Sequence, residues 1–208
     1  MSLELTLPGR WLEFPLQADD ASAQLKRFAR ELAGEHDRQA PMRARLHQQL
    51  LAAHERARHG NAEQLHLGLM LTAEVPLPAA ITVYPSIAVA TTQETTPASV
   101  MDAFVPLLLK SEHEPRGGSP LAGRDDRVFT RPQRSVLRRA RTVYAETPQP
   151  DALSIDYWQT VPRRNHVQLV HVSMADAVAT ELLITLFDEI VFASKFPEPG
   201  ALADELRG

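Results

Sequence analysis

The sequence predicts an α+β fold in which a mostly antiparallel sheet is flanked by helices. Two patterns carry this prediction: some segments alternate apolar and polar residues, and others repeat apolar residues at helical spacing. The size of the chain agrees, because 208 residues with 44% hydrophobic side chains can bury about 70% of the surface of the unfolded chain. We expect a single domain over residues 1–196, with residues 197–208 forming a mobile tail.

The first part of the chain predicts a β-hairpin and two helices. An alternating and aromatic run over 3–16, interrupted at Pro8-Gly9, is typical of a hairpin. Apolar residues at helical spacing predict a helix over about 21–33 and a second helix over 41–59, each followed by a glycine. The apolar face of the second helix consists of Leu46, Leu50, Ala53 and Ala57.

The middle of the chain predicts two strands, a helix and a loop. Alternating leucines over 65–71 and a β-rich run over 81–87 indicate two antiparallel strands. A helix is expected to begin near Pro97, and Pro106 is expected to kink or end it. Residues 111–127 are rich in glycine, proline and charge without apolar periodicity, so we expect a solvated loop there.

The last part of the chain predicts a three-stranded meander and a core helix. The strands are expected around 134–145, 152–161 and 166–174, and turn-forming residues separate them. A helix over about 177–194, with Asp176 as its N-cap, follows. Its broad apolar stripe places it in the core and contains Leu182, Leu183, Leu186, Phe187, Ile190 and Val191.

Charge and residue usage exclude several classes of protein. The chain has 22 Lys and Arg against 26 Asp and Glu, and its formal charge of −4 excludes a broadly basic nucleic-acid binder. It has no cysteine, which excludes disulfides, thiolate catalysis and cysteine-based metal sites. The first residues lack the regions of a secretory signal, and no apolar run is long enough to span a bilayer. We therefore expect a cytoplasmic protein without a membrane span.

The histidines and glycines do not form the pattern of a metal or cofactor site. His47, His54 and His59 are seven and five residues apart, which is a poor match to one face of a helix. An offset of five places His166 and His171 on opposite faces of a strand. Glycine-rich phosphate-binding motifs and a strand-to-helix nucleophile turn are also missing. We expect no metal, no cofactor, no catalytic residue and no enzymatic activity.

The clearest charge anomaly is a concentration of arginines over 124–141. On a strand these arginines alternate between the two faces, and the simplest interpretation is an exposed edge strand whose charges discourage association. A surface for an acidic protein partner is the second interpretation. Nucleic-acid binding ranks last, because the rest of the chain is acidic. The partner-binding residues would be Arg134, Arg138, Arg139 and Arg141.

An alternative function is a small-molecule binder or enzyme whose polar groups come from separate strands and leave no linear motif. A cleft with convergent polar groups and a perturbed pKa would favour this alternative. Its candidate residues are Asp156, Tyr157, Trp158, His166 and His171.

Two short segments resemble a known fold family. Residues 7–11 (LPGRW) and 186–196 (LFDEIVFASKF) resemble the first strand and the last helix of the Mog1/PsbP-like α/β/α sandwich proteins. The resemblance implies that fold and a non-catalytic role, since members are mostly partner binders or assembly factors, and the Ala- and Arg-rich composition suits an actinobacterial member. Our first hypothesis is therefore a protein-binding or assembly module, linked to a secretion or envelope system, whose partner is another protein or a second copy.

Overall fold

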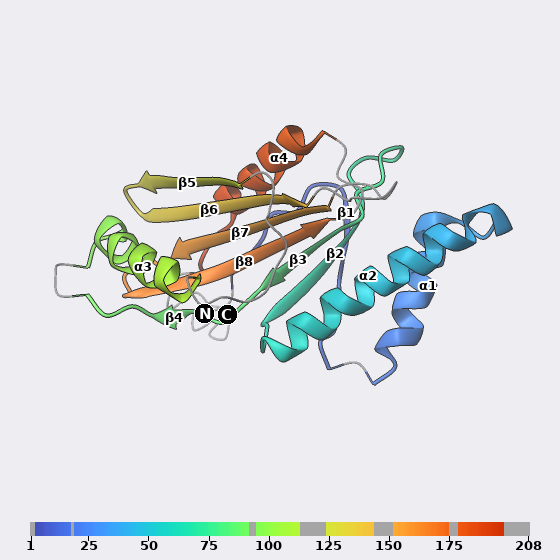
Figure 1. Cartoon of the computed structure of the whole chain (residues 1–208), viewed down its shortest axis with the longest axis horizontal. Coiled ribbons are helices and arrows are strands. Elements are labelled where there is room, and N and C mark those ends of the chain that lie inside the picture. Colours follow the sequence, from blue (N-terminus) through green and yellow to red (C-terminus); the bar gives the residue numbers. More distant parts are fainter. Residues whose placement is uncertain are drawn as a thin grey trace, which may run out of the picture.

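A computed structural model shows one eight-stranded sheet covered by helices (Figure 1). The helices are α1 (Ala21–Ala33), the short 3-10 helix η1 (Asp37–Gln39), α2 (Ala40–His59), α3 (Pro97–Glu112) and α4 (Thr180–Ala193). The strands are β1 (Arg10–Glu13), β2 (Gln64–Met70), β3 (Ala79–Val83), β4 (Ile87–Ala88), β5 (Arg124–Arg131), β6 (Arg134–Val143), β7 (Ala152–Thr160) and β8 (His166–Met174). The structure describes residues 3–17, 19–91, 95–112, 124–143, 152–174 and 179–197.

The sheet is antiparallel, with the strand order β1-β2-β3-β8-β7-β6-β5. The two-residue strand β4 lies off this path and pairs with β8. Strands β6, β7 and β8 pair in chain order, which confirms the predicted meander. The pairing of β3 with β8 joins the first half of the chain to the last.

Each face of the sheet has its own helical cover, because successive strand side chains point to opposite sides. On one face, Phe187 and Ile190 of α4 pack with strand residues such as Ile155 and Val172. On the other face, α1 and α2 pack on β2 and β3, whereas α3 packs near Leu137 and the start of β8. Figure 1 shows α1 and α2 at one end of the sheet and α3 at the other. The predicted α+β fold with an antiparallel sheet and flanking helices is confirmed.

Helices α1 and α2 match the sequence prediction closely. Both are followed by the expected glycines, Gly34 and Gly60, whose amides donate to carbonyl groups in the last helical turn. All four residues of the predicted apolar face of α2 are buried. The agreement follows from the strong local signals at these positions, which are an apolar stripe and a glycine stop.

The predicted N-terminal hairpin is wrong. Gly9 has a φ of 82°, and a Cβ at this position would lie 2.2 Å from the carbonyl oxygen of Met70, so the turn places β1 against β2. Leu3 instead lies in the core on the α4 side, and Glu4 forms a bridge with Lys195 after α4. The alternating pattern predicts an extended segment with one buried face, but it does not name the strand with which that segment pairs.

The predicted boundaries around α3 also need correction. The helix continues through Pro106, which lies on its exposed side, where water can replace the missing N–H donor for the preceding turn. Residues 124–127 of the predicted loop form the first half of β5, and residues 113–123 lie outside the described residues. The charged and glycine-rich composition therefore led to a wrong prediction of loop at residues 124–127, where an outer strand begins.

Helix α4 is central to the core, as predicted, with one exception. Leu182 is 72% exposed and does not belong to the buried stripe. The predicted N-cap Asp176 and the predicted tail after Pro197 lie outside the described residues. Among the helices of the described chain, none combines the length and the apolar character needed to cross a bilayer.

Two buried histidines predict a loss of stability in weak acid. Burial lowers the pKa of His54, which packs edge-on against Phe14, and burial also lowers the pKa of His66. Below pH of about 6.5 the unfolded chain therefore binds protons that the folded chain does not, so the free energy of unfolding decreases as the pH falls.

Urea unfolding at a series of pH values between about 7.5 and about 5.5 should show that the free energy of unfolding decreases as the pH falls. The decrease should be smaller in the double variant His54→Leu/His66→Gln. His36→Gln, at an exposed position, serves as the control and should retain the wild-type dependence. An unchanged pH dependence in the double variant would contradict the assignment to His54 and His66.

Candidate functional site

The arginines of β6 are internal, because β6 lies between β5 and β7 and is not an edge strand. Arg138 is 4% exposed and Arg139 is 2% exposed, so the interpretation as a solvated edge strand is wrong for β6. It holds for β5, which is an outer strand and carries the exposed Arg127 and Arg131. The guanidinium groups of the buried Arg138 and Arg139 are therefore not accessible to a protein partner or to a phosphate. Of the four predicted partner-binding residues, Arg138 and Arg139 are buried, whereas Arg134 and Arg141 are half-buried.

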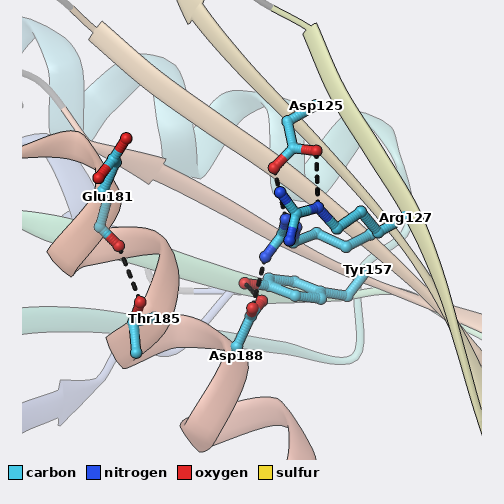
Figure 2. Close-up of polar contacts among 7 residues, drawn as sticks. Asp125, Arg127, Tyr157, Glu181, Thr185 and Asp188 are labelled. Atoms are coloured by element: carbon cyan, nitrogen blue, oxygen red, sulfur yellow. Dashed lines mark hydrogen bonds and ion pairs between the residues drawn. The ribbon is translucent and has the colours of Figure 1, made fainter.

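Arg138 joins two strands to α4 through a buried charge network. Its Nη1 donates to Asp188 on α4 and its Nη2 to Asp125 on β5, each at 2.5 Å. The Tyr157 hydroxyl donates to the other oxygen of Asp188 at 2.8 Å, and burial, together with the Asp188 carboxylate, raises the pKa of Tyr157. Figure 2 shows Asp125, Tyr157 and Asp188 converging between the sheet and α4. The two carboxylates compensate the charge of the buried Arg138 guanidinium, and Tyr157 acts as a structural hydrogen-bond donor.

The remaining arginines of β6 also contact the chain itself. Arg134 donates from Nη2 to the carbonyl oxygen of Phe192 at 2.8 Å and from Nη1 to Ser194 Oγ at 3.0 Å, at the C-terminal end of α4. A cation at this end compensates the exposed carbonyls and the helix dipole. On the opposite face, Arg139 donates from Nε to Asp126 at 3.3 Å. Sequence reasoning predicted the alternation of faces but not these partners.

Sequence reasoning missed Asp188, although the sequence contains a signal for it. Asp188 lies among Ile184, Phe187 and Val191 at helical spacing, so a carboxylate interrupts the buried face of α4. A buried carboxylate needs a cationic partner. This pattern alone indicates an internal basic residue, and Arg138 is the residue that the fold supplies.

The structure brings together two of the five candidates for a small-molecule site. Asp156 on β7 lies directly opposite His171 on β8, and His171 Nδ1 is 2.7 Å from Asp156 Oδ1. The other three candidates lie apart: Tyr157 is in the charge network, Trp158 packs on Phe104, and His166 lies opposite Ala88 of β4.

The Asp156–His171 pair lies at a cleft of about 410 Å³ between α2 and the sheet, and His171 lines it. Apolar side chains of α2 form one wall, and β3, β7 and β8 form the other. Sequence reasoning missed most of the polar lining, although the register of the β7–β8 hairpin places Ser154 opposite Ser173. The polar residues of the lining are Gln49, Arg56, Ser154, His171 and Ser173.

Charges converge at one side of this cleft. The Tyr84 ring lies against Gly60 at the end of α2, and burial raises the pKa of Tyr84. Arg56 lowers that pKa and Asp156 raises it further, so a cation and an anion both act on the same hydroxyl. Because His171 uses Nδ1 to contact Asp156, its Nε2 is the ring nitrogen available to a ligand. An apolar cleft with a few convergent polar groups is the usual form of a small-molecule site.

None of these groups forms a metal-binding cluster. Among the described residues, no three His, Asp or Glu side chains come close enough together to hold an ion. His54 is buried in α2, and His47 Nε2 contacts the carbonyl oxygen of Ser22 at 3.1 Å. Each of these histidines therefore has a structural environment of its own.

The two arginines that share Asp125 provide a matched test of the charge network. Arg138→Met leaves two carboxylates without their buried cation and should lower the free energy of unfolding by about 3–5 kcal/mol. Arg127, whose side chain is 64% exposed, also donates to Asp125. Arg127→Met should lower the free energy of unfolding by less than about 1 kcal/mol, because exposed ion pairs contribute little. Equal losses in urea unfolding of the two variants would contradict a structural role specific to Arg138.

Comparisons with protein-family models, curated proteins and solved structures find no match for this chain. The resemblance to Mog1/PsbP-like proteins therefore rests on the two short segments at 7–11 and 186–196. Function has to be argued from the geometry of the cleft, the charges around it and the surfaces that the fold leaves open.

Proposed function

We propose that this protein binds, without chemical conversion, a small molecule with an apolar body and an anionic group in the cleft between α2 and the sheet. The observation that carries this proposal is the combination of apolar walls with Arg56 and His171 in one cleft of about 410 Å³. This volume is in the range of small-molecule sites. The apolar side chains of α2 would contact the apolar body, and the guanidinium of Arg56 would bind the anion.

Arg56 is the group that best explains a preference for anions. Its guanidinium is always charged and can donate two parallel hydrogen bonds to a carboxylate, sulfonate or phosphate. Asp156 accepts a hydrogen bond from His171 and is not among the residues that line the cleft, so its carboxylate does not form part of the wall that would contact the anion. The Nε2 atom of His171 then adds a second polar contact on the sheet side of the cleft.

The cleft supports binding better than catalysis. Ser154 and Ser173 line the same surface as His171, but no hydrogen bond joins either hydroxyl to the imidazole within the described residues. A serine nucleophile needs that contact with its base. The expectation of a non-enzymatic protein therefore stays part of the proposal, as does the cytoplasmic location expected from the sequence.

A pair of naphthalene dyes tests the proposal. The anionic dye 8-anilinonaphthalene-1-sulfonate should bind one site per chain, whereas N-phenyl-1-naphthylamine has the same apolar body without the charge. Arg56→Gln should weaken binding of the anionic dye about tenfold, or about 1.4 kcal/mol, and should leave the neutral dye unaffected. Arg58→Gln is the control, since Arg58 is exposed on the same helix and does not line the cleft. Fluorescence titration measures the dissociation constant of each dye for the wild type and for both variants.

A steric variant tests the place of binding. Ser154→Phe projects a ring into the cleft from β7 and should abolish binding of both dyes, while circular dichroism reports whether the variant is folded. Ala52→Phe fills the cleft from α2 and provides an independent check. Equal effects of Arg56→Gln and Arg58→Gln, or full binding by both folded phenylalanine variants, would overturn the proposal.

A further inference from the structure

Strand β5 is an outer strand of the sheet, and within the described residues it pairs only with β6 (Figure 1). All eight of its residues pair with β6 without a break in the register, so the other side of β5 is a long edge within the described residues. Val128, in the middle of β5, is 52% exposed. Val128 also lines a groove of about 220 Å³ between β5 and α3, beside the exposed Leu109. A long edge with exposed apolar side chains is a surface suited to strand addition.

The opposite edge of the sheet is protected in a way that β5 is not. Strand β1 has only four residues, and its register with β2 is irregular between Arg10 and Trp11. Short and irregular edge strands do not template further pairing. Strand β5 is longer and regularly paired, and in the part of the chain that the structure describes it is protected by its charged side chains. The order of these charges allows opposite charges to face each other when β5 pairs with its own copy.

Symmetry limits how β5 can pair with a copy of itself. A two-fold axis normal to the sheet generates an antiparallel pair in which the same surface of both copies is used. This operation keeps every side chain on its own face, so residues directly opposite each other must differ by an even number of positions. One residue of β5 must therefore lie at the axis, directly opposite its own copy. The axis cannot lie level with the peptide bond between two successive residues.

Among the axes near the middle of β5, the charges select one. An axis at Asp126 or at Arg127 places two identical charges directly opposite each other, and an axis at Phe129 places Arg127 opposite Arg131. Like charges in directly opposite positions destabilise a sheet. An axis at Val128 avoids these contacts and pairs Asp125 with Arg131, Arg127 with Phe129, Asp126 with Thr130 and Val128 with its own copy.

We propose that two copies of this chain associate through antiparallel pairing of their β5 strands about a two-fold axis at Val128. The pairing extends the sheet across both copies and covers the exposed valine. On the α4 face it adds two Asp125–Arg131 ion pairs and two contacts between Arg127 and the Phe129 ring. Asp125 retains an accessible side for this contact, since its side chain is 41% exposed while it accepts from Arg127 and Arg138.

A pair of charge variants tests the axis. Val128→Lys and Val128→Glu each place two identical charges at the axis, so each variant alone should have the monomer mass of 23.1 kDa in light scattering after size exclusion, where the wild type has twice that mass. An equimolar mixture of the two should recover the doubled mass, because lysine then faces glutamate. Leu182→Lys, at an exposed position on α4, is the control and should behave as the wild type.

The absence of cysteine from the chain allows a direct test of proximity. Val128→Cys should be cross-linked to its own copy by a short bis-maleimide, and Leu182→Cys should not. A wild type that remains monomeric at high concentration, or charge variants that retain the doubled mass, would overturn the proposal. Dye binding in the cleft is independent of this result, because the cleft is lined by α2, β3, β7 and β8 and not by β5.

Discussion

The burial of Arg138 is the constraint on which the arrangement of β5, β6 and α4 depends. A guanidinium removed from water is strongly unfavourable unless carboxylates accept its hydrogen bonds, and here the carboxylates come from two separate elements, Asp125 on β5 and Asp188 on α4. A slip of one residue between β5 and β6 would move Asp125 to the other face of the sheet. A rotation of α4 would separate Asp188 from both Arg138 and Tyr157. The network therefore specifies the register of the outer hairpin and the orientation of the last helix together.

The two faces of the sheet differ because of how they are covered. On the α4 side, one helix and the leucines of the first residues form a continuous core with the middle of the sheet. On the other side, the cover is divided into two clusters, one with α1 and α2 and one with α3. The cleft lies beside α2, where its cover of β3 gives way to β7 and β8. Polar side chains such as His171 and Asp156 are tolerated there because they stay partly in contact with water.

The proposed ligand site and the proposed interface use different parts of the same sheet. The cleft is lined by α2, β3, β7 and β8. The proposed interface is the side of β5 that faces away from β6, and β6 separates β5 from β7. A ligand and a second copy of the chain therefore do not compete for the same surface. Three of the arginines that first suggested a partner-binding surface, Arg134, Arg138 and Arg139, instead connect the intervening strand β6 to β5 and to α4.

Elements with local signals can be predicted from the amino-acid sequence alone. The stripe and glycine stop of α2, the alternation in β2 and the three strands of the meander were predicted because each pattern is read within one segment. The sequence also predicted the alternation of arginines on β6. Three other features become known only from the folded chain: β1 pairs with β2, Arg138 and Arg139 are buried, and His171 contacts Asp156 beside α2. These outcomes depend on contacts between residues far apart in the chain, and periodicity determines which face of an element is buried but not which element covers it.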